Sequence, residues 1–317
     1  MATNRPFLRL EPTAEVAAVR RIALLRALHL GDFLCSVPAL RALRERFPGA
    51  EITLIGLPWV RPLVNRYPYL DRFLEFPGYK GLEGMGWDRN KTQRFLEEAR
   101  SYGYDLAIQM HGDGGVSNGF VAQLGARISL GYRPNDPARD RELNLEMPWD
   151  PGDHEIRRWL RLVGVVGAMG TPYLEFPLGP ADWSEVESVV ARVGVDLARP
   201  MVGLHPGGRE PQKRWPPECF ALAADLLAAE LGAQVVITGV REELETAERV
   251  AAEMRSGRAH VLAGETSLGA LAALLSRLRI LVTNDTGVSH LAVAVGAPSV
   301  VLFGPTDPAR WAPLDTD

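Results

Sequence analysis

Residues Ile280–Pro305, with the sequence ILVTNDTGVSHLAVAVGAPSVVLFGP, indicate the fold of this chain. Two short apolar runs, Ile280–Thr283 and Ser299–Phe303, are rich in Val, Leu and Ile, which is typical of buried strands in a parallel sheet. A polar turn over residues 284–287 and a helical segment separate the two runs. The stretch therefore predicts a strand, a turn, a helix and a second strand, the repeating unit of α/β proteins.

The turn in this stretch is a candidate anion site. Asp285, Thr286 and Gly287 lie where a strand ends and a helix begins. Free backbone N–H groups and the positive end of the helix dipole face outward at such a position. Ligands of open α/β sheets also bind beyond the carboxyl ends of the strands. Taken alone, the turn is better explained by a helix N-cap at Asp285 or Thr286, so a binding site needs support from other loops.

Length and composition bound the class of protein. A chain of 317 residues is too long for one ordinary core and predicts two domains. Its 46% hydrophobic and 23% charged residues are those of a soluble globular protein. A net charge of −4 gives no support to general nucleic-acid binding. The two cysteines, Cys35 and Cys219, are far apart and form no disulfide framework or metal site, which favours a reducing compartment.

The sequence predicts no membrane-spanning or secretory segment. The first 21 residues have no apolar core of signal-peptide length. Gly296 and Pro298 interrupt the most apolar region, so no segment is expected to cross a bilayer. We therefore expect a cytoplasmic protein, and peripheral contact with a membrane surface remains compatible with the sequence.

Strand candidates alternate with helical patterns along the chain, which predicts βαβ units and mainly parallel sheets. The first strand candidate is Arg21–Leu28. Tyr132–Asp150 is polar and punctuated by proline, so we expect a loop there. Thr171–Asp182 carries three prolines between two periodic regions and predicts an interdomain linker. The predicted domains are 1–172 and 173–317.

The loop His205–Pro216 follows a predicted strand and carries residues suited to phosphate binding. Gly207 and Gly208 allow the backbone to approach a ligand closely. Lys213 adds positive charge, and a glycine turn, a strand end and a cation together indicate a phosphate cradle. The loop is not a P-loop, because G-x-x-x-x-G-K-[ST] is absent. A solvated loop with surface cations explains these residues equally well.

Two further loops of the second half follow strands and are expected at the same edge of the sheet. Glu242 and Glu243 lie where a carboxylate contacts a ribose diol in dinucleotide-binding folds. Their place in the first turn of a helix is better explained by the helix dipole alone. For Ser267, an N-cap role suffices, although its loop is also a candidate border of a base pocket.

Four residues of the first half lie at comparable strand ends. Gly31 permits an unusual turn, and the carboxylate of Asp32 is suited to accept a proton from an attacking hydroxyl. In isolation, Asp32 is better explained as an N-cap. His111 and Asp113 follow another buried strand and are candidates to line an acceptor site. A lone histidine at a strand end is more often structural.

Several common site types lack their motifs. No G-x-G-x-x-G follows a strand, and no G-x-S-x-G is present, which disfavours a Rossmann dehydrogenase and an α/β-hydrolase. No histidine and cysteine cluster has zinc spacing. The D-x-D at Asp315–Asp317 does not follow a strand, so a carboxylate-held Mg²⁺ is not indicated. We expect neither a metal site nor a cofactor.

Five motifs occur in order along the chain. They are RIALLRALHLGDFLCSVPALRAL at Arg21–Leu43, HPGG followed by KRWP within His205–Pro216, SLGALAALL at Ser267–Leu275, NDTGVSHLA at Asn284–Ala292 and LFGPTDP at Leu302–Pro308. As an ordered set they resemble glycosyltransferase family 9, the heptosyltransferase family of lipopolysaccharide inner-core synthesis. The resemblance extends from Arg21 to the end of the chain.

The resemblance implies the GT-B architecture, in which two Rossmann-like α/β domains face each other across a cleft. The N-terminal domain would hold the acceptor, and the C-terminal domain would hold the nucleotide sugar. Family members commonly continue into a terminal helix that crosses back onto the N-terminal domain. The present sequence stops at Asp317, soon after the last motif, so the resemblance leads us to expect that it lacks this helix.

The resemblance also implies roles for single residues. Asp32 matches the aspartate proposed as general base, and Lys213 matches the lysine near the donor diphosphate. The D-T-G at 285–287 matches the segment whose backbone N–H groups meet the donor phosphates. The family's ribose contact falls on Glu242 or Glu243.

The implied reaction is inverting, metal-independent transfer of a heptose or similar sugar. ADP-heptose would be the donor, and a lipopolysaccharide-core or related glycan would be the acceptor. The partners would be this nucleotide sugar and a glycolipid at the cytoplasmic face of the inner membrane. Two alternatives stay open: another GT-B enzyme that uses a UDP- or GDP-sugar, and a non-catalytic nucleotide-sugar-binding protein. Nucleotide preference and turnover distinguish the three.

Overall fold

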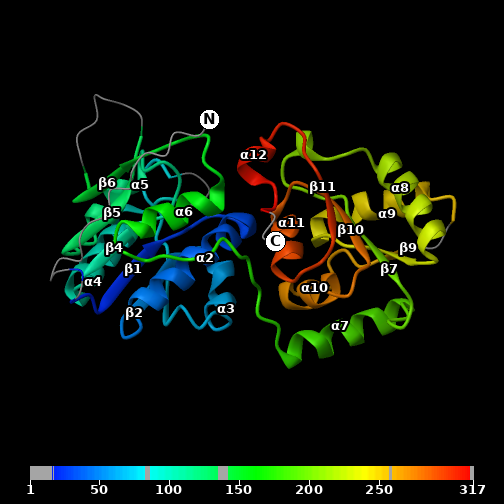
Figure 1. The fold of residues 1–317 in the computed structure, drawn as a ribbon, viewed down its shortest axis with the longest axis horizontal. Coiled ribbons are helices and arrows are strands. Elements are labelled where there is room, and N and C mark those ends of the chain that lie inside the picture. Colours follow the sequence, from blue (N-terminus) through cyan, green and yellow to red (C-terminus); the bar gives the residue numbers. More distant parts are fainter. Residues whose placement is uncertain (1–15, 17, 83–85, 135–141, 257–258, 315–317) are drawn as a thin grey trace. The chain divides into compact units, whose positions relative to one another are not determined.

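The chain forms two compact units, Met1–Pro172 and Tyr173–Asp317, which we call unit 1 and unit 2 (Figure 1). The computed structural model describes residues 16, 18–82, 86–134, 142–256 and 259–314. Each unit has its own parallel sheet, so the predicted α/β class is confirmed.

Unit 1 contains a six-stranded sheet among its described residues, in the order β3-β2-β1-β4-β5-β6. All neighbouring strands run parallel. The chain adds β2 and β3 on one side of β1 and β4 to β6 on the other, so the order reverses between β1 and β4. This is the Rossmann order, whose reversal point is where ligands bind. The strands are β1 (Arg21–Leu25), β2 (Glu51–Gly56), β3 (Arg72–Glu75), β4 (Leu106–Gln109), β5 (Ile128–Arg133) and β6 (Leu145–Pro148).

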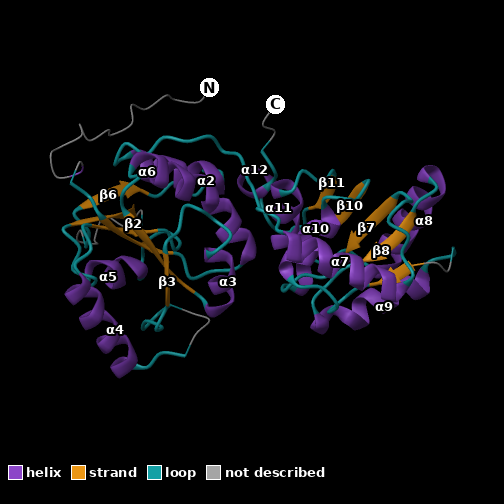
Figure 2. Cartoon of the chain, turned by 90° about the horizontal axis from the view of Figure 1, so that it is seen from below, coloured by secondary structure: helices purple, strands orange, loops and turns teal. Residues whose placement is uncertain are grey.

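Helices cover both faces of this sheet (Figure 2). α2 and α6 pack against each other on one face. α4 and α5 lie on the other face, where Leu96 and Phe120 join a buried cluster with Ala23 and Leu25 of β1. Alternate strand residues point to opposite faces, so the strands in the middle of the sheet are mostly apolar on both faces. The helices are α2 (Leu30–Arg46), α3 (Arg61–Val64), α4 (Arg89–Tyr102), α5 (Ser117–Ala122) and α6 (Glu155–Gly164), with a 3₁₀ turn at Pro58–Val60.

The prediction of a loop at Tyr132–Asp150 is partly wrong. β5 continues to Arg133, and Leu145–Pro148 forms β6, which pairs with β5 in parallel register. Residues 135–141 lie outside the described part of the chain. β6 is a four-residue edge strand that ends in proline, and an edge strand tolerates a residue without an N–H donor. Its apolar pattern is too short to predict a strand.

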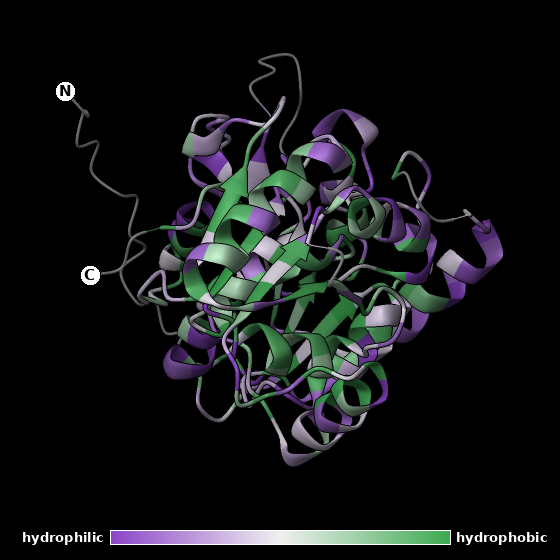
Figure 3. Cartoon of the chain, turned by 90° about the vertical axis from the view of Figure 1, so that its right-hand side faces the viewer, coloured by the Kyte–Doolittle hydropathy of each residue, from purple (hydrophilic) through white to green (hydrophobic). Residues whose placement is uncertain are grey.

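Unit 2 has a five-stranded parallel sheet among its described residues, in the order β11-β10-β7-β8-β9. The order reverses between β7 and β10, as in the Rossmann order. Hydrophobic segments lie mainly in the interior of the chain and hydrophilic ones mainly at its periphery (Figure 3). The strands are β7 (Met201–His205), β8 (Gln234–Ile237), β9 (Ala259–Val261), β10 (Ile280–Asn284) and β11 (Ser299–Leu302).

α8 and α9 pack together over one face of this sheet and bury a cluster that includes Phe220, Ala247 and Val235. α7 packs on α10, and α11 joins β10 to β11. The helices are α7 (Pro180–Val193), α8 (Pro217–Leu231), α9 (Leu244–Glu253), α10 (Leu268–Leu275), α11 (Gly287–Ala294) and α12 (Pro308–Trp311), with 3₁₀ turns at Pro211–Lys213 and Arg241–Glu243.

Two glycines shape the loop that connects β4 to α5. Gly114 has a φ of +92°, and a Cβ atom there would lie 2.2 Å from the carbonyl oxygen of Tyr132 on β5. Gly112 has a φ of +69°, but nothing lies within 4 Å of its Cβ position. Both glycines relieve backbone strain, and Gly114 also permits the close approach to β5.

We predict that Gly112→Ala lowers the free energy of unfolding by about 1–2 kcal/mol, the cost of a left-handed alanine. Gly114→Ala should cost about 1–3 kcal/mol more, because its methyl group also meets the β5 backbone. Urea unfolding followed by circular dichroism measures both losses. Equal losses would show that the approach to β5 does not fix the loop.

Candidate active site

In unit 2, two loops leave the sheet on either side of the point where the strand order reverses. β7 ends at His205 and leads into Pro206–Gly208, and its neighbour β10 ends at Asn284 and leads into Asp285. Loops at such a point diverge and leave room for a ligand. The two segments from which the sequence predicts a donor site therefore lie on adjacent strands.

The buried side chain of Asn284 ties these loops together. Its Nδ2 donates to the carbonyl oxygens of Pro206 and Gly207, each at 2.9 Å. Its Oδ1 accepts from the backbone N–H of Trp215 at 3.0 Å. An amide offers two donors and an acceptor, and all three functions are used. One side chain thus fixes both ends of the glycine loop.

Lys213 lies beside Asp285 within this cluster. Its Nζ is 3.8 Å from Asp285 Oδ2 and 3.7 Å from Glu210 Oε1, and its side chain is 19% exposed. Thr306 donates a hydrogen bond to Asp285 Oδ2 at 2.6 Å. Both lysine separations exceed hydrogen-bond distance, so the ammonium group is attracted to these carboxylates without donating to them. The ammonium group thus stands at the end of β10, where α11 begins.

The N-terminus of α11 completes the cluster. Thr286 is its N-cap, as one sequence interpretation predicted, and accepts from the N–H of Val288 at 3.3 Å. Gly287 is the first helical residue. A Cβ atom on Gly208 would lie 3.2 Å from Thr286 Cγ2, so the glycine loop passes close to this cap. The helix dipole and Lys213 both contribute positive potential here.

Glu243 supports the glycine loop from the other side. Its Oε1 accepts from the N–H of Gly208 at 2.7 Å, and its Oε2 accepts from the N–H of Val240 at 2.9 Å. A Cβ atom on Gly207 would lie 2.1 Å from the Glu243 carboxyl carbon, so glycine is required for this approach. Each carboxylate oxygen retains a further acceptor position.

His205, at the end of β7, is buried, and its Nε2 lies 3.9 Å from Glu243 Oε2. The Thr238 hydroxyl donates to the carbonyl of Leu204 at 3.1 Å, so it accepts from His205 Nδ1 at 3.0 Å, which fixes the proton on Nδ1. Burial lowers the pKa of His205, although the nearby Glu243 charge opposes this shift. We conclude that His205 is a neutral structural support for the loop.

The other two predicted donor residues are less closely joined to this cluster. Glu242 is exposed in the 3₁₀ turn that precedes α9. Ser267 is the N-cap of α10, as predicted, and its hydroxyl accepts from the N–H of Ala270 at 3.2 Å and donates to Glu185 of α7 at 2.7 Å. The hydroxyl of Ser267 is therefore already used by the helix cap and by the contact with α7.

In unit 1, Asp32 lies in the first turn of α2, where β1 gives way to the helix. The N-cap is His29 rather than Asp32, and Asp32 Oδ2 accepts from the backbone N–H of His29 at 3.2 Å. Gly31 precedes Asp32 in the same turn. The Asp32 side chain is 22% exposed, so the carboxylate caps the helix and still reaches the surface.

Arg26 is a central residue of this site that sequence reasoning missed. It is buried, and its Nη1 donates to the carbonyl of Met110 at 2.6 Å, while its Nε donates to the carbonyl of Asp32 at 3.0 Å. It therefore joins the ends of β1 and β4, the two strands at the reversal point. Charge in an otherwise apolar strand segment, RIALLRAL, was the available signal.

His111 follows β4 and lies in the field of Arg26 and Asp32. Burial and the charge of Arg26 lower the pKa of His111 to about 4, while the charge of Asp32 opposes the shift. Its Nδ1 is buried without a hydrogen-bond partner among the described residues. Asp113, by contrast, is exposed and accepts from the N–H of Gly115 at 2.9 Å, an Asx turn. His111 rather than Asp113 thus has an unused polar atom near Asp32.

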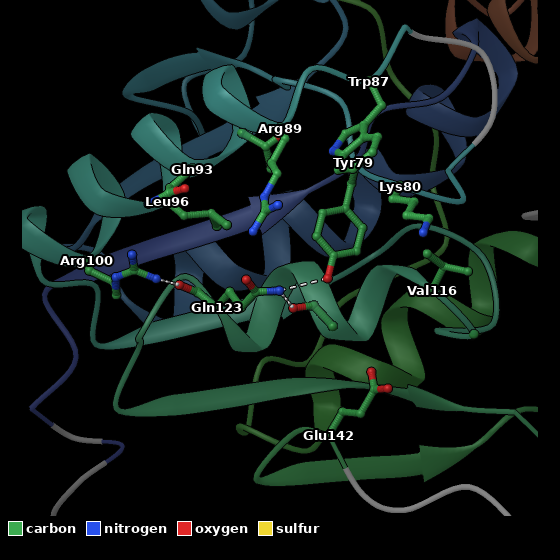
Figure 4. A pocket seen from close by; sticks show the side chains of 13 residues that line it. Tyr79, Lys80, Trp87, Arg89, Gln93, Leu96, Arg100, Val116, Gln123 and Glu142 are labelled. Carbon is green, nitrogen blue, oxygen red and sulfur yellow. Dashed lines mark hydrogen bonds between the residues drawn. The ribbon is translucent and has the colours of Figure 1, made fainter.

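A pocket of about 690 Å³ lies beside the same β4–α5 loop (Figure 4). Residues of α4 and of α5 line the pocket, and the ring of Tyr79 lies between the two helices. Gln123 donates to the Tyr79 hydroxyl at 2.7 Å. The charged lining residues are three cations and one carboxylate, and the aromatic ones can stack on a sugar. These residues are Tyr79, Lys80, Trp87, Arg89, Arg100 and Glu142.

No three His, Cys, Asp or Glu side chains in the described part of the chain are grouped so that they could hold a metal ion. No helix described here is long and apolar enough to cross a membrane.

Comparison with known proteins assigns the family. The sequence model of glycosyltransferase family 9 (heptosyltransferase) matches residues 92–317. The chain belongs to glycosyltransferase family 9. As a family 9 member it is an enzyme of the glycosyltransferase class, and its two Rossmann-like units are those of the GT-B fold, as predicted.

Individual family 9 proteins align with most of the chain. It is 29% identical to lipopolysaccharide heptosyltransferase 2 of Escherichia coli strain K12, over 90% of this chain and 83% of that protein. The structure of E. coli ADP-heptose LPS heptosyltransferase II matches with 26% identity and a TM-score of 0.73, over 94% of this chain and 88% of the other. A family 9 glycosyltransferase from Veillonella parvula has the same fold, with 23% identity, a TM-score of 0.78 and coverage of 93% and 85%.

The state of His111 makes a pH-dependent prediction. The unfolded chain protonates this imidazole below pH 6.5, whereas the folded chain resists protonation down to about pH 4. The fold therefore loses stability as the pH falls through that window. His111→Gln lacks this titration, so its unfolding free energy relative to the wild type should rise as the pH falls from 6.5 to 4. Urea unfolding at several pH values measures the difference. A difference that is constant with pH would contradict a buried neutral imidazole.

Proposed function

We propose that this enzyme transfers a heptose from ADP-heptose to a lipopolysaccharide-core acceptor, with inversion and without a metal ion. The observation that carries the proposal is the cluster of Lys213, the glycine loop and the α11 N-terminus at the reversal point of unit 2. The family membership and the relative named for ADP-heptose and LPS support the donor and the acceptor.

In this proposal unit 2 holds the donor. The β-phosphate would accept hydrogen bonds from the backbone at Thr286 and Gly287 and from Lys213 Nζ. Negative charge grows on the diphosphate as its bond to the anomeric carbon breaks, and these groups stabilise it. Glu243 would contact the ribose rather than Glu242, because Glu243 already contacts the glycine loop. A cation and a helix terminus would do here what a metal ion does in other transferases.

Unit 1 would hold the acceptor, with Asp32 as general base. The acceptor oxygen attacks the anomeric carbon from the face opposite the diphosphate, and Asp32 takes the hydroxyl proton. The carbon–oxygen bond to the diphosphate breaks, and ADP leaves with the electron pair. Inversion follows from this single displacement. His111, which lies in the electrostatic field of Asp32, would line the acceptor site in this proposal.

The pocket between α4 and α5 would bind an anionic sugar of the acceptor. Gly115 and Val116 of the β4–α5 loop line this pocket, and the same loop begins at His111 beside Asp32. Cations outnumber carboxylates in its lining, which suits a carboxylated or phosphorylated saccharide. Since such an acceptor is lipid-linked, we propose that the enzyme works peripherally at the cytoplasmic face of the inner membrane.

Asp32→Asn should reduce transfer from ADP-heptose by about 10²–10⁴-fold, the usual contribution of a general base. ADP affinity should stay nearly unchanged, and the helix cap is retained because asparagine also offers an Oδ acceptor to His29. Product formation measured by mass spectrometry gives the rate. Asp182→Asn is the control, since Asp182 caps α7 in the same way, with its Oδ2 accepting from the N–H of Gly179 at 2.8 Å. Near-normal transfer by Asp32→Asn would rule out Asp32 as base.

Lys213→Ala should weaken ADP binding by about 1.5–3 kcal/mol, the value of a charge-assisted hydrogen bond. Isothermal titration calorimetry measures the dissociation constant. Arg209→Ala removes a positive charge from the same loop and should change affinity much less. If both variants lose affinity equally, the loop acts through its net charge and Lys213 has no specific role.

A further inference from the structure

Arg26 lies directly after β1 and is 1% exposed, so its charge is withdrawn from solvent. Two carboxylates face its Nη2: Asp32 Oδ1 at 3.7 Å and Glu155 Oε1 at 3.6 Å. A buried arginine is costly unless its charge is paired and its N–H groups are satisfied. The contacts of Arg26 therefore need a physical reason beyond packing.

The guanidinium group joins two loops at the reversal point of unit 1. Nε and Nη2 both donate to the backbone carbonyl of Asp32. Nη1 points to the other side and donates to the carbonyl of Met110, which follows β4. The planar fork makes these bonds at once, and a lysine ammonium has no equivalent geometry. Arg26 thus fixes the backbone of Asp32 relative to the strand that leads into His111.

Two residues of α6, Trp159 and Glu155, hold Arg26 in place. The guanidinium carbon lies 4.6 Å from the ring centre of Trp159. Glu155, at the start of α6, pairs with Arg158 and accepts from Trp159 Nε1 at 3.1 Å. Ring stacking and carboxylate contact leave the Arg26 head one orientation.

The backbone carbonyl and both carboxylate oxygens of Asp32 have defined surroundings. Oδ2 accepts from the N–H of His29, and the backbone carbonyl accepts from Arg26. Oδ1 is 3.7 Å from Arg26 Nη2, which is too long for a hydrogen bond. The carboxylate therefore keeps acceptor positions that these contacts do not use.

We propose that Arg26 is a positioning residue, which holds Asp32 so that its carboxylate faces the acceptor hydroxyl. This inference rests on the proposed role of Asp32 as general base. Arg26 contacts no substrate in this scheme and acts through the Asp32 backbone. Small displacements of a catalytic group lower the rate strongly even when binding is unchanged.

A purely structural role is the competing explanation, and the chain contains a matched control for it. Arg158 is also buried, pairs with Glu155 and donates to the carbonyls of Asp150 and Asp153 at 2.8 and 3.0 Å. Its guanidinium carbon lies 3.8 Å from the ring centre of Trp149. Arg158→Lys therefore disturbs the same charge cluster, and its described hydrogen bonds go to the start of α6 rather than to the first turn of α2.

The test compares Arg26→Lys and Arg158→Lys in the full chain. Both variants keep the positive charge and lose the planar guanidinium group, and the melting temperature measures the loss of stability. Arg26→Lys should lower kcat by about 100-fold with KM for the donor and ADP affinity nearly unchanged. Arg158→Lys should lose comparable stability and keep most of its kcat. Parallel losses of kcat and melting temperature in the two variants would overturn the proposal.

A double-mutant cycle separates this inference from the proposed function. If Arg26 acts through Asp32, adding Arg26→Lys to Asp32→Asn should cause little further loss in single-turnover rate. Additive losses would show that Arg26 acts independently of Asp32 and would overturn the inference. An active wild type, an impaired Asp32→Asn and an unimpaired Arg26→Lys would remove the inference alone. Absence of heptose transfer by the wild type would instead remove the proposed function.

Discussion

In each unit, one buried polar side chain spans the two strands between which the order of the sheet reverses. Arg26 connects the ends of β1 and β4, and Asn284 connects the ends of β10 and β7. Loops diverge at this point in any doubly wound sheet, so backbone carbonyl groups there lose their neighbours. A side chain with several fixed donors satisfies those carbonyls and sets the loops at one separation. Asp32 and His111 in unit 1, and the glycine loop and Asp285 in unit 2, lie on the segments that these two residues hold.

The choice of residue matches the chemistry proposed at each site. Asn284 is neutral, so it fixes the glycine loop without adding charge, and Lys213 and the α11 N-terminus supply the positive potential. Arg26 is charged and lies beside Asp32, whose ionised form is the one that accepts a proton. His111 and His205 fit the same pattern, because burial lowers the pKa of each imidazole and favours its neutral form near the charged groups.

Sequence patterns predicted the parts of the fold that depend on local periodicity. Apolar runs gave the strands, and polar residues before helices gave the caps at Ser267 and Thr286. The placement of Asp285, Lys213 and the glycine loop in one cluster followed from the rule that parallel strands end at one edge. The contributions of Arg26 and Asn284 were not predictable in this way, since each depends on a contact between distant segments: Arg26 and Met110 are 84 residues apart, and Asn284 and Pro206 are 78 residues apart. The Asp32 cap was misassigned because His29 takes the N-cap position, and β6 was missed because its four residues lie at a sheet edge.

The central claim is that the cluster at the reversal point of unit 2 is a metal-free site for an adenine nucleotide diphosphate. Calorimetric titration of the full chain with ADP, UDP and GDP, each with Mg²⁺ and with EDTA, tests it most directly. The account predicts that ADP binds more tightly than UDP or GDP and that EDTA leaves its affinity unchanged. A preference for UDP or GDP, or binding that requires Mg²⁺, would contradict the claim.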